Sequence, residues 1–452
     1  MNTKMKTWEK ISYGMGDLAN NLMFGPVAYY LLYFYTDVAG ISLALVSLLM
    51  GVARAVDAVA SPFIGGLVDR TNTRWGKTRP YLLFTTLPLG VLMVLCFLVP
   101  NASMNAVALY ALFTYLGFSL LYTLNNVAYL TLLTVMTPDN GIRLQLGGIR
   151  MAGMAVGSLV ANGLLLPIIL LLGSGNERRG FALTALLFGI VSVLLLMNCF
   201  LFTRERIEVV PERGPLLGSM RTMGKSRPFL ILCTVQILGW VMQSFFYQNT
   251  VFYAKYLLHN EQFAAAMMAL PTLCLLGVSP FISLLARRFG KRRFMAVSYA
   301  ASAAALLLVW AAGDRVWLVL PGSMLAGFGT GCALSMGILT CSDTIDHVEW
   351  LTGKKLQGLM TSMMLFAAKL GLVVTGTLSP FVLGLGGYVA NAEQSLTALM
   401  AIRTNYIFLP VLLGLLCLFL LRFYRLDERQ MENITNELVQ RRFEKASQQG
   451  LK

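Results

Sequence analysis

Long apolar stretches recur along the chain, from one that begins near Leu22 to one that ends at Leu421, and short polar segments separate them. A helix needs about 20 apolar residues to cross a hydrocarbon core about 30 Å thick. Because the stretches approach or exceed that length, the pattern predicts an all-α membrane protein with twelve transmembrane helices. The predicted spans are residues 20–35, 41–68, 81–99, 105–135, 144–172, 181–202, 229–253, 263–285, 294–312, 316–339, 357–383 and 406–421.

The composition agrees with a membrane protein. Hydrophobic residues make up 57% of the chain, charged residues only 13%, and the mean hydropathy is +0.68, whereas soluble domains carry about 25% charged residues. The net charge of +15 could suggest a nucleic-acid partner. Most Lys and Arg residues, however, lie in segments that are cytoplasmic if the N-terminus is inside. The opposite segments hold only Arg178, Arg179, Lys255, Arg315 and Arg403.

This distribution of basic residues follows the positive-inside rule. It predicts that both termini are cytoplasmic, which requires an even number of spans. It also explains the basic excess by topology, so that we expect membrane lipid and no nucleic acid as a partner. The start of the chain, MNTKMKTWEK, has no short apolar core with a small-residue cleavage site behind it, and we expect no cleavable signal peptide.

An internal repeat divides the chain into two halves. SPFIGGLVDRTNTRWGKTR begins at Ser61 and SPFISLLARRFGKRR at Ser279; each ends an apolar stretch and leads into a basic loop. Parallel repeats of six helices build many secondary transporters, whose substrate sites lie between the halves near mid-membrane. The predicted units are a six-helix bundle over 1–203, a cytoplasmic linker over 204–227, a second bundle over 228–421 and a cytoplasmic tail over 422–452.

Four charged residues fall inside the predicted spans: Arg54, Asp57, Arg150 and Lys369. Such residues are costly in a bilayer and usually face a partner or a hydrated path for an ion or substrate. Arg54 and Asp57 are three residues apart and share a helix face. They could form a structural ion pair, or Asp57 could bind H⁺ or Na⁺ with the hydroxyl of Ser61, four residues later, beside it.

Polar and aromatic residues form stripes on several predicted helices. Tyr122, Asn126 and Tyr129 recur at helical spacing, and so do Trp240 and Gln243 with their neighbours Gln236 and Tyr247. Such stripes can be hydrogen bonds between helices, or they can line a wet cavity. Amides and aromatic rings suit a sugar, because it offers both hydroxyl groups and an apolar ring face.

Five motifs, YGMGDLANN, YFYTDVAG, ARAVDAVASP, DRTNTRWGKTRPYLLF and SDTIDHVEWLTGKKLQG, resemble those of the glycoside–pentoside–hexuronide:cation symporters. This is the melibiose-permease-like branch of the major facilitator superfamily. The resemblance covers nearly the whole chain. It implies two pseudo-symmetric six-helix halves, alternating access in a bacterial inner membrane, and a sugar or glycoside driven by H⁺ or Na⁺. It implies no enzymatic activity and no cofactor besides the coupling ion, and we expect a monomer.

The resemblance also implies roles for residues. Asp57 matches the first cation-site aspartate of the melibiose permeases, Ser61 falls where they have a second aspartate, and Thr123 matches a cation-site threonine. The loss of the second aspartate favours H⁺ coupling, or weak coupling, over Na⁺ coupling. The predicted cation-coupling residues are Asp57, Ser61, Thr123 and Arg54.

Asn21 and Asn126 fall where melibiose permeases have two sugar-binding aspartates. If Arg54 and Asp57 cancel, Arg150 and Lys369 remain as uncompensated cations, which favours an anionic substrate. We therefore expect an acidic glycoside, a glucuronide or a sulfonated sugar; the alternatives are a neutral glycoside with weak or no cation coupling, or a lysolipid-type substrate on the same fold. The predicted substrate-binding residues are Asn21, Tyr30, Tyr122, Asn126, Tyr129, Arg150, Trp240, Gln243 and Lys369.

The loop DRTNTRWGKTR resembles the cytoplasmic gating motif of the superfamily. An acidic cluster in the second half, within SDTIDHVEWLTGKK, would face it and close the inner end when the transporter is outward-open. Topology alone accounts for the basic residues but not for the acidic cluster. The predicted cytoplasmic gate is Asp69, Arg70, Arg74, Lys77, Asp343, Asp346 and Glu349.

Other protein classes fit less well. The only two histidines, His259 and His347, lie in predicted loops, and neither the cysteine spacing nor a phosphate-binding glycine loop points to a metal site or an ATP-driven pump. A membrane enzyme is therefore not expected. A receptor that has kept the fold and lost transport remains an alternative, and counterflow in vesicles would separate it from a carrier.

Overall fold

The computed structural model describes residues 5–71, 73–137, 139–206, 226–278, 281–352, 357–424 and, in the tail, 426, 430–431, 434 and 436–438. Within these residues the backbone is helical apart from short connections and one isolated bridge between Thr73 and Gly76. Most of the predicted linker and tail lie outside the described residues. The start of the second repeat, Ser279 and Pro280, lies outside them too, and the domain boundaries stay a prediction.

The first half consists of helices separated by short π-helical turns. In order they are α1 (Thr7–Gly25), η1 (Pro26–Tyr30), α2 (Leu31–Tyr33), η2 (Phe34–Val38), α3 (Leu43–Arg70), α4 (Arg79–Cys96), α5 (Met104–Met136), α6 (Asn140–Leu159), η3 (Val160–Leu164), α7 (Leu165–Gly173) and α8 (Glu177–Phe202).

The second half repeats this arrangement. Its elements are α10 (Arg227–Leu257), α11 (Gln262–Val278), α12 (Ile282–Phe289), α13 (Lys291–Ala312), α14 (Val316–Thr352), α15 (Gln357–Leu385), α16 (Leu396–Arg403), η5 (Thr404–Phe408) and α17 (Leu409–Leu421).

Ten helices of the described residues are long and apolar enough to cross a membrane. The continuous helical run from α1 to η2 and the shorter apolar helix α11 complete twelve spans, as predicted. The predicted limits were less accurate. The last span begins at Leu396 rather than at 406, and α14 continues to Thr352 rather than ending at 339, because helical hydrogen bonding continues where the apolar pattern stops.

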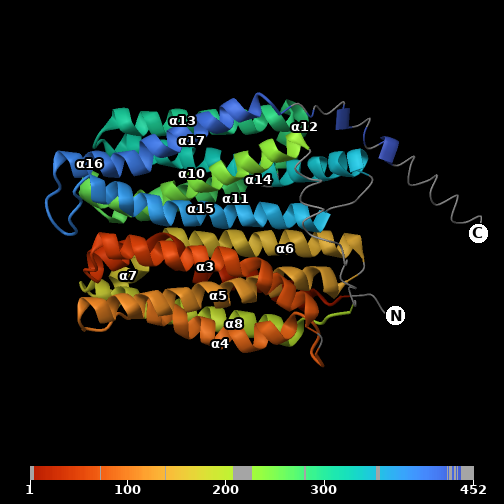
Figure 1. Ribbon diagram of the computed structural model, residues 1–452, viewed down its shortest axis with the longest axis horizontal. Coiled ribbons are helices and arrows are strands. Elements are labelled where there is room, and N and C mark those ends of the chain that lie inside the picture. The colour runs from red at the N-terminus through yellow and green to blue at the C-terminus, as the bar shows by residue number, and fades with distance from the viewer. Residues whose placement is uncertain are drawn as a thin grey trace, which may run out of the picture.

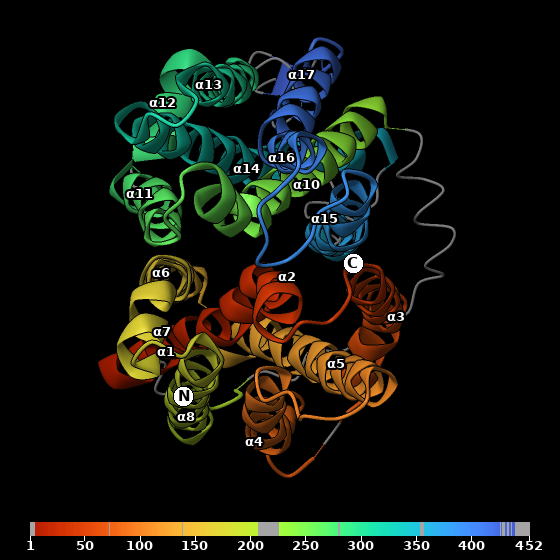
Figure 2. The same cartoon turned by 90° about the vertical axis from the view of Figure 1, so that its left-hand side faces the viewer.

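The two halves lie side by side as separate bundles (Figure 1). The first half carries the red to yellow-green helices and the second half the green to blue ones, and the view along the helices in Figure 2 shows each bundle in cross-section. Both chain ends lie at one end of the molecule (Figure 1). We call this the terminal end and the opposite one, where α16 lies, the far end. The main contacts between the halves join α3 to α15 and α11 to η3.

Glycines bring α1 and α6 into close contact. A Cβ at Gly153 of α6 would overlap the main-chain oxygen of Gly14 in α1, and one at Gly157 would lie 2.7 Å from the oxygen of Leu18. Small residues commonly let membrane helices approach in this way, because helices in lipid associate through packing rather than through the hydrophobic effect. The contact holds α1, whose residues border the cavity described below, against its own bundle.

We predict that Gly153→Ala destabilises the protein by about 1–3 kcal/mol, because the added methyl group meets main chain that cannot rotate away. Gly147→Ala is the matched control, because it lies in the same helix and a Cβ there meets nothing within 4 Å. Thermal unfolding in detergent should show a lower midpoint for Gly153→Ala only. Equal midpoints for the two variants would contradict the close α1–α6 contact.

Candidate functional site

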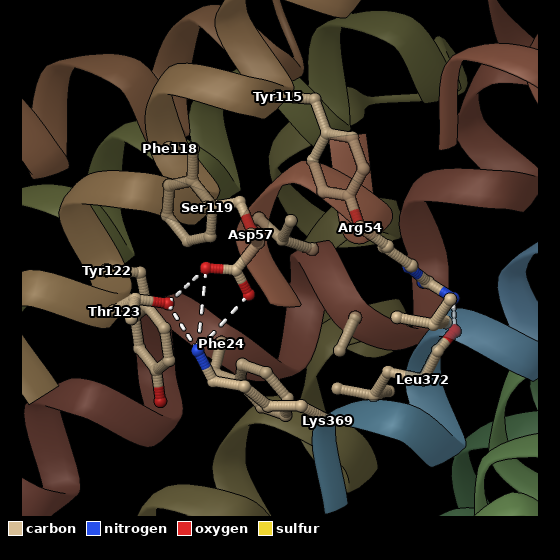
Figure 3. A pocket seen from close by; sticks show the side chains of 13 residues that line it. Phe24, Arg54, Asp57, Tyr115, Phe118, Ser119, Tyr122, Thr123, Lys369 and Leu372 are labelled. Carbon is tan, nitrogen blue, oxygen red and sulfur yellow. Dashed lines mark hydrogen bonds and ion pairs between the residues drawn. The ribbon is translucent and has the colours of Figure 1, made fainter. Parts of the chain in front are cut away.

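A cavity of about 60 Å³, partly open to solvent, lies between the two halves. Helices α1, α3 and α5 of the first half and α15 of the second contribute its walls (Figure 3). Charged and aromatic side chains line it together, as in many small-molecule sites. The lining residues that carry polar or aromatic groups are Phe24, Arg54, Asp57, Tyr115, Phe118, Ser119, Tyr122, Thr123 and Lys369.

An ion pair crosses the cavity from one half to the other. The ammonium of Lys369, on α15, lies 3.3 Å from Oδ2 of Asp57, on α3 (Figure 3). Thr123 donates a hydrogen bond of 2.5 Å to Oδ1 of Asp57. Lys369 in turn donates to the hydroxyl oxygens of Ser61, at 2.5 Å, and Thr123, at 2.8 Å. A carboxylate and two hydroxyl groups therefore surround the lysine.

The hydrogen bonds in this cluster are mutually consistent. Ser61 donates to the main-chain oxygen of Asp57 at 2.7 Å, so its oxygen is free to accept from Lys369. Thr123, which is 2% exposed, likewise donates to Asp57 and accepts from Lys369. Three predicted cation-coupling residues thus lie together. The sequence predicts Lys369 as a substrate-binding residue, and the structure brings its ammonium among the predicted cation-coupling residues.

The expected mutual cancellation of Arg54 and Asp57 is wrong in this structure. Arg54 donates from Nε to the hydroxyl of Tyr115 at 2.8 Å, and from Nη1 to the main-chain oxygen of Leu372 on α15. Its Nη2 has no hydrogen-bond partner among the described residues, although Arg54 is only 4% exposed. A spacing of three residues places two side chains on one face, but the long arginine side chain turns away toward the other half (Figure 3).

Arg150 also has a partner that the sequence left open. Its Nε lies 3.3 Å from Oδ2 of Asp17 on α1. The two cations expected to be uncompensated, Arg150 and Lys369, are therefore both paired. The charged residues among the described residues that line the cavity are Arg54, Asp57 and Lys369, and Asp57 is paired with Lys369. The excess of one positive charge falls on Arg54.

The other predicted substrate residues divide into two groups. Tyr122 lines the cavity and stacks between Phe24 and Phe118, with ring centroids 5.3 and 5.9 Å away. Asn21 instead accepts from Ser158 at 3.0 Å.

Tyr129 and Tyr30 are also held by the protein, because they donate to the main-chain oxygens of Tyr13 and Asn162 at 2.7 Å. The described residues that line the cavity do not include Asn21, Tyr30, Asn126, Tyr129, Arg150, Trp240 or Gln243.

At the terminal end, two residues of the predicted gate, Asp343 and Arg74, make contacts within their own halves. Asp343 forms an ion pair of 2.7 Å with Lys291 of α13, and Arg74 lies over the ring of Trp75 at 4.2 Å. The side chain of Asp69 lies outside the described residues, and Arg70 is exposed. Lys77, half-buried, follows α3, while Asp346 and Glu349, also half-buried, lie near the end of α14. This gate was predicted for another conformation and stays a prediction.

Sequence reasoning missed a carboxylate that holds the basic loop. Glu205, just after α8, accepts hydrogen bonds of 2.7–3.1 Å from the main-chain N–H groups of Lys77, Thr78 and Arg79 and from the Thr78 hydroxyl. An acid at the N-terminus of a helix, here α4, is favourable electrostatically. The clue was an acidic residue directly behind the sixth span.

Comparisons with known proteins agree with this architecture. Residues 12–428 match the family described as MFS/sugar transport protein. The isoprimeverose transporter of Lactiplantibacillus pentosus is 33% identical, over 95% of this chain and 91% of its own. The glucuronide carrier protein homolog of Escherichia coli is 30% identical, over 98% of this chain and 97% of its own length.

Among solved structures, a bacterial homolog of the human lysosomal transporter Spinster, in an inward-facing and unoccupied conformation, matches with a TM-score of 0.64 at 15% identity. The match covers 95% of this chain and 99% of the solved structure's chain. At this identity it shows only that the two proteins share a fold. The relatives are transporters and not enzymes, and they favour sugars over lysolipids as the substrate class. The chain belongs to the MFS/sugar transport protein family, as a glycoside–pentoside–hexuronide:cation symporter that imports sugars by secondary active transport.

Proposed function

We propose that this protein imports its sugar together with a proton, that Asp57 carries the proton, and that Lys369 replaces it when the carrier is empty. The position of the Lys369 ammonium, among Asp57, Ser61 and Thr123, supports this proposal. A cation and a lysine that need the same oxygens exclude each other. Binding of the coupling ion therefore releases Lys369 and, with it, a contact between the two halves.

The exchange accounts for coupling in physical terms. A carrier must return empty, and an unpaired carboxylate in the bilayer interior would cost several kcal/mol. Lys369 neutralises Asp57 during that return. When Asp57 is protonated, its charge is gone and the attraction to Lys369 falls with it. The lysine is then free to contact the substrate, which explains why one residue serves both ion and sugar.

The set of oxygen atoms favours a proton over sodium. Hard cations bind through several oxygen ligands, whereas this cluster offers one carboxylate and two hydroxyl groups, and Lys369 already contacts all three. A proton needs no such shell of ligands, because it binds to a single carboxylate oxygen.

For the substrate, we propose an acidic glycoside. The cavity and its surroundings retain one excess positive charge, now at Arg54 rather than at Arg150 and Lys369. An anionic group on the sugar would balance it. A neutral glycoside is the second candidate, because both of the other cations are paired. The names of the relatives include both isoprimeverose and glucuronide, so relatives support either class.

We also propose that both termini face the cytoplasm of a bacterial cell. The distribution of basic residues favours this orientation. The terminal end, where both chain ends lie (Figure 1), would then be the inner end. The far end would face outward.

We predict that Asp57→Asn abolishes accumulation driven by a proton gradient, because an amide does not take up and release the proton. Uptake into vesicles, with pH and Na⁺ gradients imposed separately, should stop at equal concentrations on both sides. Asp314→Asn, which changes an exposed carboxylate outside the spans, is the control and should behave as the parent. Undiminished accumulation by Asp57→Asn would reduce Asp57 to a structural partner.

A second carboxylate should change the ion. We predict that Ser61→Asp makes accumulation respond to a Na⁺ gradient, because a second acid adds both charge and oxygen ligands beside Asp57. Ser61→Ala is the matched control and should show no response to Na⁺. If Ser61→Asp remains driven by protons alone, the number of carboxylates does not determine the coupling ion.

Competition for uptake tests the substrate class. We predict that glucuronides or sulfonated glycosides compete at concentrations at least about tenfold below those of matched neutral glycosides, equivalent to about 1.4 kcal/mol. Arg54→Lys should keep this preference because lysine retains the positive charge. Arg54→Gln should lose it because glutamine is neutral. Equal competition by neutral glycosides in the parent protein would favour the second candidate.

A further inference from the structure

A second ionic cluster joins the two halves at the far end, away from the cavity. We call it the far-end cluster; it consists of Tyr33, Asp37, Lys255, Tyr256, Tyr388 and Asn391. Its centre is Asp37, in η2, whose side chain is fully buried. Lys255 of α10 lies 3.1 Å from Oδ1 of Asp37, and Tyr388, in the connection after α15, donates to Oδ2 at 2.7 Å.

Further donors of the second half complete the surroundings of Asp37. Tyr256 donates to Oδ1, and Asn391 donates to the main-chain oxygen of Asp37 at 2.5 Å. The carboxylate of Asp37 thus holds three residues of the second half, and its main-chain oxygen holds a fourth. Lys255 is equally well held, because it also donates to Asn391 at 2.7 Å and to Tyr33 at 3.1 Å.

Apolar and aromatic contacts lie between this cluster and the cavity. The rings of Tyr29 and Tyr247, from opposite halves, are 5.2 Å apart, and the hydroxyl of Tyr30 lies 2.9 Å from the sulfur of Met268. These contacts also cross from the first half to the second. Together with the far-end cluster, these contacts join the two halves on the far-end side of the cavity.

We propose that Asp37 and Lys255 form the outer gate of the transporter, a latch separate from the Asp57–Lys369 pair. This rests on the proposed orientation, in which the far end faces outward. Removing one partner of a buried ion pair leaves the other charge uncompensated and is strongly destabilising, whereas water compensates both when the halves separate. The pair therefore has two stable arrangements, closed and hydrated, as a gate requires.

The same physics predicts what single substitutions do. Asp37→Asn removes the carboxylate that contacts Lys255 in the closed state, and Lys255→Met removes the cation that contacts Asp37. Each should shift the population toward the outward-open state. Restoring opposite charges in exchanged positions, Asp37→Lys with Lys255→Asp, should shift it back.

A cysteine in the cavity reports on opening. Ser119 lines the cavity, and Ser119→Cys is the reporter, labelled by a membrane-impermeant thiol reagent added to one side of oriented vesicles at a time. The same variants without Ser119→Cys measure the background of the native cysteines. We expect Asp37→Asn and Lys255→Met to speed labelling from the outer side by at least about tenfold, and the exchanged pair to label as slowly as the parent.

The controls separate the gate from a general effect of charge and from the orientation. Glu393→Gln removes an exposed carboxylate from the same connection and should leave labelling unchanged. Acceleration from the inner side only would show that the proposed orientation is reversed while the gate stands. Labelling at the parent rate by both single variants, or an exchanged pair that labels as fast as they do, would overturn the proposal.

Discussion

An ionised side chain in the interior of a bilayer is tolerated only beside an opposite charge, a set of polar groups or water. This constraint explains why Asp57 and Lys369 meet although they lie on different halves of the molecule. Neither half satisfies its own charge at this depth, so the empty carrier is held together by the pair. In the proposed mechanism, a coupling ion that binds Asp57 releases Lys369 and so weakens this contact between the two halves.

The same constraint appears at two depths. Asp57–Lys369 lies in the cavity, where a sugar and an ion could reach it, and Asp37–Lys255 lies behind two layers of contacts at the far end. In both, the acid belongs to the first half and the lysine to the second. In the proposed mechanism, one pair controls access from the far end and the other responds to occupancy of the cavity. Within the first half, glycines bring α1 and α6 into close contact.

That Asp57, Ser61 and Thr123 lie together could be predicted from the sequence. Asp57 and Ser61 are one helical turn apart, and Thr123 lies within a polar stripe, so the cluster follows from spacing and from the resemblance to symporters. The partners of the charges could not be predicted. Arg54 lies on the face of Asp57 yet bonds to Tyr115 and Leu372. Helical spacing places a side chain on a face, but it does not say where a long, flexible chain ends.

The sequence by itself determined the number of spans, the two halves and the polar positions inside the membrane, because hydropathy and helical periodicity are local properties. A segment that crosses the bilayer core as a helix must satisfy its own backbone hydrogen bonds, so these local patterns are closely followed there. Only the tertiary structure decided which charges pair: Lys369 with Asp57, Arg150 with Asp17, and Lys255 with Asp37. Two of these pairs join residues more than 200 positions apart. Their choice depends on how two bundles face each other, which is a matter of shape and distance that no local pattern contains.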